Sequence, residues 1–212
     1  MCPGPGQEQE DGLREVDLST QRLRVLPPTV LSNSMLESLD LDRNKLRNVT
    51  GISKLCNLKK LILSKNEIVD FPREIQSLVC LERLELNQNQ IRIIPEGVFS
   101  RLPRLKFLRL NNNRLCALPR DLAACQGSLQ YLNISNNLFQ TFPQPVLQLA
   151  RLQELHVITA MLAERKSNLA HFIDNLEGSE EPKLYVDQWE RLKEMDSCTL
   201  TVGLRLSWVL AG

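Results

Sequence analysis

The stretch "LKFLRLNNNRLCALP", from Leu105 to Pro119, decides the fold of this chain. Its first leucines are spaced as in a short strand with one apolar face, and three consecutive asparagines, Asn111 to Asn113, then interrupt the pattern. Asparagine is uncommon in strands and common in turns, because its short amide bonds to nearby backbone groups. We therefore predict a strand that ends in a bend at the asparagines.

The same frame recurs along the chain with a spacing of 22 to 24 residues. The copies begin at Leu13, Leu36, Leu58, Leu81, Leu105, Leu129 and Leu152. Their core is L-x-x-L-x-L-x-x-N-x-L, which together with the period is the pattern of the leucine-rich repeat. The chain resembles the leucine-rich-repeat family from about Leu13 to Leu162, with imperfect first and last copies. The resemblance implies an α/β fold, a right-handed, curved solenoid with a parallel sheet on its concave face.

The three asparagines fall in different columns when the copies are aligned. The structural column consists of Asn44, Asn66, Asn89, Asn113 and Asn137. We predict that these amides form a ladder that satisfies backbone groups inside the bend, where unpaired groups are costly. Asn111 belongs to another column, with Ser19, Asp42, Ser64, Asn87 and Ser135. Because strand side chains alternate, we expect Asn111 to point outward and to tolerate solvent.

The chain divides into three segments. Residues 1–12 are rich in Pro, Gly and acidic residues, and we expect a disordered N-terminal lead. Residues 13–162 form the repeat domain of seven repeats, and residues 163–212 form a C-terminal cap helix and variable tail. The cap is expected because a solenoid exposes an apolar end and Met161 to Leu176 has apolar residues at helical spacing. Thr199 to Leu210 instead alternates with the period of a strand.

Prolines mark where most copies leave the sheet. They are Pro27, Pro72, Pro95, Pro119 and Pro143. Proline lacks an N–H donor and fixes φ, which suits a loop that departs from a strand. The segments that follow predict short helical or irregular turns on the convex side. The second copy lacks this proline and reads "LRNVTGISKLCN".

Composition limits the classes of function. The chain has 212 residues, 42% apolar and only 5% aromatic, so leucines must fill the core. The formal net charge is +1 without long blocks of one sign, and we expect no nucleic-acid and no membrane partner. The six cysteines include no C-x-x-C pair, and no apolar leader begins the chain. Free cysteines in a reducing compartment, the cytoplasm with the nucleus as a further possibility, explain this best.

Catalytic motifs are missing from the sequence. The two histidines, His156 and His171, have no partners placed to form a catalytic pair, and no glycine-rich phosphate loop occurs. We therefore expect no enzyme activity, no cofactor and no metal site.

Two columns of side chains should face outward from the concave sheet. The first is Glu15, Ser38, Lys60, Arg83, Phe107, Tyr131 and Glu154, and the second is Asp17, Asp40, Ile62, Glu85, Arg109, Asn133 and His156. Aromatic and arginine side chains are common anchors of protein interfaces. The predicted partner-binding residues are Lys60, Arg83, Phe107, Arg109 and Tyr131. The alternative is simple packing, with the Arg109 stem covering the Phe107 ring.

These features predict a monomeric, non-enzymatic scaffold that binds a protein partner of unknown identity through its concave face. The alternative is a regulatory or targeting subunit of a phosphatase or small-GTPase pathway. That alternative follows only from the resemblance to intracellular Ras-suppressor-like and phosphatase-regulator-like repeats. A third possibility is a structural fragment whose tail blocks its own concave face.

Overall fold

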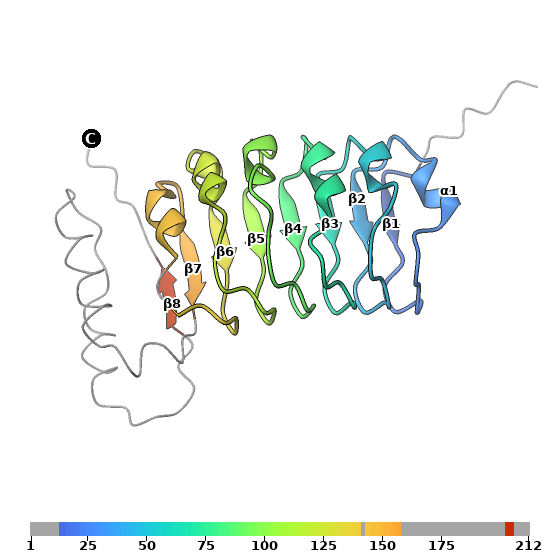
Figure 1. Cartoon of the computed structure of the whole chain (residues 1–212). Helices are drawn as coiled ribbons and strands as arrows, with labels where there is room; N and C mark the ends of the chain where they lie inside the picture. Colours follow the sequence, from blue (N-terminus) through green and yellow to red (C-terminus); the bar gives the residue numbers. More distant parts are fainter. Residues whose placement is uncertain (1–12, 141–142, 158–201, 206–212) are drawn as a thin grey trace, which may run out of the picture.

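The computed structural model describes residues 13–140, 143–157 and 202–205, the last as backbone only. Seven short strands pair in parallel and in chain order into one open sheet (Figure 1). They are β1 (Glu15–Asp17), β2 (Ser38–Asp40), β3 (Lys60–Ile62), β4 (Arg83–Glu85), β5 (Phe107–Arg109), β6 (Tyr131–Asn133) and β7 (Glu154–Val157). The predicted leucine-rich-repeat solenoid is thus confirmed.

Short helical turns line the side of the solenoid opposite the sheet. They are α1 (Pro28–Leu31) and the 3-10 turns η1 (Ile52–Lys54), η2 (Arg73–Ser77), η3 (Phe99–Arg101), η4 (Arg120–Cys125) and η5 (Gln144–Gln148). A proline directly precedes four of them: Pro27, Pro72, Pro119 and Pro143, with φ of −63°, −71°, −66° and −70°. This φ is the one that the pyrrolidine ring imposes, so each proline prepares the chain for the turn that follows.

The second copy, which lacks the proline, enters its turn through a glycine. Gly51 precedes η1 with φ of 89°, a left-handed conformation that costs glycine little. The Glu74 carboxylate of the next coil accepts hydrogen bonds from the Gly51 N–H at 3.0 Å and the Ser53 hydroxyl at 2.9 Å. A side chain of the neighbouring coil therefore satisfies the N-terminal end of this turn.

The core is a continuous column of leucines between the sheet and the turns. The middle residue of each of β2 to β6 is a fully buried leucine, from Leu39 to Leu132, and β7 buries Leu155 almost completely. Each leucine packs against the same position of the coils before and after it, so stability is close to a sum of neighbour terms. At the first coil this packing is one-sided, and Val16 and Leu18 are only partly buried.

The asparagine column joins successive coils. The Asn113 amide donates to the carbonyls of Leu86 and Leu110 at 3.0 Å, and its carbonyl accepts from the Ile91 N–H at 3.1 Å. Bonds of the same kind are made by Asn44, Asn66, Asn89 and Asn137. Each amide therefore pairs backbone groups of its own coil and of the preceding one.

The expectation for Asn111 requires correction. Asn111 lies at the end of the strand but is only 9% exposed, and Ser64, Asn87 and Ser135 of its column are also buried. Strand β5 is only three residues long, so the chain is already turning at this position and neighbouring coils cover it. Buried polar groups need partners, and the Ser64 hydroxyl donates to the Asn87 amide oxygen at 2.7 Å.

The far edge of the sheet is occupied by a distant segment. Strand β8 (Val202–Arg205) pairs antiparallel with β7, so that Leu155 lies opposite Leu204. The strand period predicted within Thr199 to Leu210 is confirmed for these four residues. The predicted cap helix from Met161 to Leu176 lies outside the described residues, as does the predicted disordered lead.

Candidate protein-binding surface

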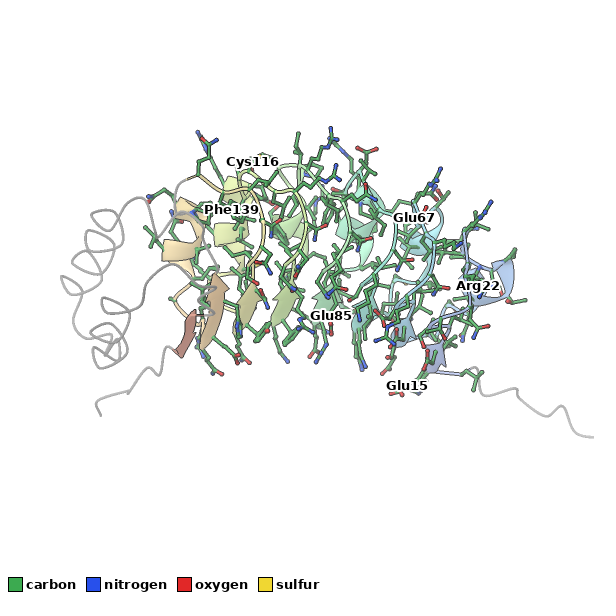
Figure 2. The ribbon with its side chains drawn as sticks, turned by 90° about the horizontal axis from the view of Figure 1, so that it is seen from below. Glu15, Arg22, Glu67, Glu85, Cys116 and Phe139 are labelled. Carbon is green, nitrogen blue, oxygen red and sulfur yellow. The ribbon has the colours of Figure 1, made fainter. Side chains whose placement is uncertain are left out.

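The parallel register assembles the two predicted columns on one face of the sheet. Glu15, Ser38, Lys60, Arg83, Phe107, Tyr131 and Glu154 are successive register partners. The second column, from Asp17 to His156, is aligned in the same way. Figure 2 shows Glu15 and Glu85 on this strand side of the solenoid. Neighbours in a column are one strand spacing apart, about 4.8 Å.

An aromatic row crosses β4 to β7. The Phe107 and Tyr131 rings are stacked with centroids 4.0 Å apart and planes 7° apart. The Arg83 guanidinium carbon lies 4.0 Å from the centre of the Phe107 ring, and the His156 ring lies 5.3 Å from that of Tyr131. Stacked rings and a cation over a ring are both attractive arrangements. Arg83 and Tyr131, rather than Arg109, therefore pack against Phe107, and its ring is only partly exposed.

A buried carboxylate lies beside this row, two residues along β4 from Arg83. Glu85 is 5% exposed, and it accepts hydrogen bonds from Arg83 Nε at 2.7 Å and from Arg109 Nη1 at 3.3 Å. The pairing offsets the cost of removing the carboxylate from water. It also fixes both guanidinium groups on the concave face. The Nε atom of Arg109 is buried and has no hydrogen-bond partner among the described residues.

The N-terminal part of the same face is acidic. Glu15, Asp17, Asp40 and Asp42 are exposed or partly exposed there. The Ser19 N–H donates to Asp17 at 2.8 Å, and this bond lowers the pKa of the Asp17 carboxyl. Asp40 accepts an equivalent bond from the Asp42 N–H at 2.9 Å. The face therefore changes from negative charge over β1 and β2 to positive charge over β3 to β5.

The five predicted binding residues do not form one contact cluster. Arg83, Phe107 and Tyr131 touch in a row, and Arg109 joins them through Glu85. Lys60 is the register partner of Arg83 on β3, and two cations do not attract each other. Sequence reasoning missed the role of Glu85. Its position two residues after Arg83 and opposite Arg109 was the available signal, because alternate strand residues share a face.

Other kinds of site find little support in the described part of the chain. It contains no group of three or more metal-ligating side chains. It also contains no helix that is long and apolar enough to span a bilayer. Cys125 is buried, and burial raises the pKa of its thiol to about 12. A thiol with so high a pKa is almost entirely protonated at neutral pH and is a poor nucleophile.

Curated proteins with similar sequences match only part of this chain. A volume-regulated anion channel subunit LRRC8E from Xenopus tropicalis is 34% identical over 90 residues, which is 41% of this chain and 11% of that protein. The geranylgeranyl transferase type-2 subunit alpha of Rattus norvegicus is 37% identical over 92 residues, 42% of this chain and 16% of that protein. The chain thus spans less than a fifth of the length of these relatives.

Solved structures share the architecture. An internalin (inlF) from Listeria monocytogenes has a TM-score of 0.52 at 28% identity, covering 62% of this chain and 37% of the internalin. The ectodomain of the receptor kinase GASSHO1/SCHENGEN3 from Arabidopsis thaliana, in complex with CASPARIAN STRIP INTEGRITY FACTOR 2, has a TM-score of 0.56 at 25% identity. The match covers 69% of this chain and 18% of the ectodomain.

Family profiles match the coils directly. One described as "Leucine rich repeat" matches residues 11–68 and 56–115, and a second of the same description matches residues 128–149. The matched residues contain the asparagine ladder and the strands from β1 to β6. The chain therefore belongs to the leucine-rich-repeat family.

Proposed function

We propose that this chain is a non-enzymatic interaction module that binds a protein partner through its concave face. Leucine-rich-repeat domains generally mediate protein–protein interactions, and their solenoids offer extended concave surfaces for this purpose. The observation that carries the proposal is the row formed by Arg83, Phe107 and Tyr131 in the centre of the sheet, in which Arg83 is paired with buried Glu85. Arginine and aromatic side chains at the centre of a surface are typical interface anchors.

The row is ordered before any partner binds. Arg83 is fixed by both Glu85 and the Phe107 ring, so little side-chain freedom remains to be lost on binding. Both faces of the Phe107 ring are covered by its neighbours, so a partner would contact ring edges, the Tyr131 hydroxyl and guanidinium N–H groups. Ring edges carry positive partial charge. These groups favour oxygen acceptors such as carboxylates.

The charge gradient suggests how the partner segment would lie. A carboxylate over Arg83 and Arg109 could accept their remaining N–H bonds, while a basic side chain would meet Asp17 and Asp40 over β1 and β2. Complementary charges of this kind fix orientation and speed association more than they add affinity. We therefore propose a segment with acidic and basic ends rather than a uniformly charged one.

A reducing, cytoplasmic location is part of this proposal. The four described cysteines, Cys56, Cys80, Cys116 and Cys125, are all free. Cys56 and Cys116 are exposed, and exposed free thiols persist best where cellular thiols are kept reduced.

The test is affinity capture with a variant that keeps the buried Glu85 pairing. Arg109→Glu is unsuitable, because it would place a second carboxylate beside Glu85. Lys60→Glu with Tyr131→Ala instead changes two partly exposed side chains of the concave face. We expect the wild type to retain a protein from lysate that this variant retains about thirtyfold less, since truncated anchors often cost about 2 kcal/mol.

A control carries the same charge reversal and a second truncation to alanine on the convex side. Lys54→Glu with Gln76→Ala alters one charge and one exposed side chain on η1 and η2. The control should capture the same protein as the wild type, and all three chains should share one thermal midpoint. Equal capture by the folded concave variant would place the binding surface elsewhere.

A further inference from the structure

A second surface lies along one flank of the solenoid, where the chain leaves the bend after each strand. Backbone bonds join successive coils there, for example Lys45 N–H to the Leu23 carbonyl at 2.8 Å and Arg114 N–H to the Ile91 carbonyl at 2.9 Å. Residues on either side of these bonds therefore stack in columns. We call this surface the basic flank; it consists of Arg22, Arg24, Val25, Lys45, Arg47, Glu67, Val69, Asp70, Arg92, Ile93, Arg114 and Leu138.

The basic flank concentrates positive charge that the whole chain does not have. It contains six basic and two acidic side chains, whereas the chain as a whole has a formal net charge of +1. All six basic side chains are exposed. Arg47 pairs with Glu67 at 3.2 Å, and none of the other five forms an ion pair with any described residue. In Figure 2, Arg22 and Glu67 lie on this flank, away from Glu15 and Glu85.

The opposite flank provides an internal comparison. There the charges alternate from coil to coil and neutralise one another. Glu37 pairs with Arg14 at 3.1 Å and with Lys59 at 2.9 Å, and Glu82 pairs with Lys106 at 2.9 Å. The two flanks therefore differ: the cations of the opposite flank are paired, whereas those of the basic flank, except Arg47, are not paired with any described residue.

Exposed aliphatic side chains lie between the cations. Val25 is 65% exposed, Val69 42%, Ile93 74% and Leu138 56%. Val25 directly follows Arg24, and Ile93 directly follows Arg92. Leu138 follows Arg114 in the next coil, since the Leu138 N–H bonds to the Leu115 carbonyl at 2.8 Å. Cations and aliphatic groups thus share one surface that is roughly 24 Å long, at about 4.8 Å for each coil.

We propose that the basic flank binds the surface of an anionic lipid bilayer. Cations near such a surface are attracted by its negative potential, and aliphatic side chains enter the boundary of the acyl region. The centre of a protein–protein interface is instead apolar and depleted of charged residues. The basic flank has no such apolar centre. Single-stranded nucleic acid is bound by stacking on aromatic rings, and every apolar side chain of the flank is aliphatic. The net charge of the whole chain did not indicate this surface, because it sums the charges of all faces of the molecule.

The experiment measures co-sedimentation of the full chain with vesicles. One set contains phosphatidylcholine with about 30% phosphatidylserine, and the other contains phosphatidylcholine alone. We expect binding to the first set only, with a loss as salt is raised from about 0.05 to about 0.5 M. Arg92→Glu with Arg114→Glu should weaken binding about tenfold or more. Ile93→Ser should weaken it less and leave the salt dependence in place.

Matched variants separate this surface from general charge effects. Arg101→Glu with Arg104→Glu makes the same charge change on the convex side and should bind as the wild type does. If the first charge variant fails to fold by circular dichroism, Arg22→Glu with Lys45→Glu replaces it, with the same expected loss. The proposal is overturned if the wild type does not bind the anionic vesicles. It is also overturned if the convex variant loses as much binding as the Arg92→Glu, Arg114→Glu variant. Concave-face capture is measured separately, so either proposal can fail alone.

Discussion

Three adjacent asparagines have three different physical roles. Asn113 is buried and pairs backbone groups of two coils. Asn112 is exposed and has a φ of 57°, in the left-handed region. The equivalent residues of other coils, such as Arg43 and Asn136, also have a positive φ. Asn111 is buried, and its amide donates to the Asn112 side chain at 2.8 Å while its own oxygen has no described partner. Identity of residue type therefore does not imply identity of role.

We predict that Asn113→Ala lowers the free energy of unfolding by about 1–3 kcal/mol, because it leaves buried backbone groups unpaired. Asn111→Ser should change it by no more than about 0.5 kcal/mol. Serine occupies this column in other coils, as at Ser64 and Ser135, and it removes the unpaired amide oxygen. Urea melts of both variants measure the difference, and equal losses would contradict the assigned roles.

A second prediction at this scale concerns the backbone at Asn112. Asn112→Val should lower the free energy of unfolding by about 1–2 kcal/mol, because a β-branched residue is strained at positive φ. Asn112→Gly should be tolerated within about 0.5 kcal/mol, since glycine adopts this conformation readily. Urea melts again provide the measurement. A valine variant as stable as the glycine variant would show that the bend relaxes.

At the scale of the elements, carboxylates of one coil hold the turns of an adjacent coil. The Glu96 carboxylate accepts bonds from the Arg120 N–H at 2.9 Å and the Asp121 N–H at 3.3 Å at the start of η4. Glu74 accepts a bond from the Gly51 N–H and so holds the turn η1 of the preceding coil. The bonds from Arg120 and Asp121 lower the pKa of the Glu96 carboxyl. Convex turns that are too short to be stable alone are thus fixed by their neighbours.

This arrangement predicts a pH-dependent effect of Glu96→Gln. Because folding lowers the carboxyl pKa, the stabilisation by Glu96 is present above the ordinary value of 4.5 and is lost as pH falls through the lowered folded value. The variant should therefore be less stable than the wild type at neutral pH, and the gap should narrow at about pH 3. Urea melts at the two pH values test this. A gap that is unchanged by acid would mean that the charge of Glu96 contributes nothing.

For the whole molecule, the two ends of the sheet differ. At the N-terminal end, β1 is a free edge within the described residues, with Val16 and Leu18 partly buried. At the other end, β8 covers the backbone groups of β7. Exposed strand edges can pair with further chains, and at this end the exposed edge is that of β8 in place of the β7 edge.

We predict that a chain ending at Cys198, which lacks β8, self-associates more than the full chain. The freed β7 edge can pair with a second copy, and this should appear as concentration-dependent mass in light scattering. A chain ending at Arg205 keeps β8 and serves as the control. Monomers at every concentration for both chains would show that β8 is dispensable for protecting this edge.

The sequence by itself determined the number of coils, the strand register and the asparagine ladder. These depend on a period that each coil repeats and on contacts between nearest neighbours, so aligning copies was enough. The two concave columns followed for the same reason, from Glu15 to Glu154 and from Asp17 to His156.

Only the tertiary structure decided how side chains pair within and between those columns. It placed Arg83 rather than Arg109 over the Phe107 ring, buried Asn111, and set Glu85 between two arginines. Such outcomes depend on side-chain conformation and on how coils cover one another. The residue types at aligned repeat positions do not specify either. The pairing of β8 with β7 joins segments far apart in sequence, and no repeat pattern encodes it. The charge of the basic flank is likewise visible only once the coils are stacked.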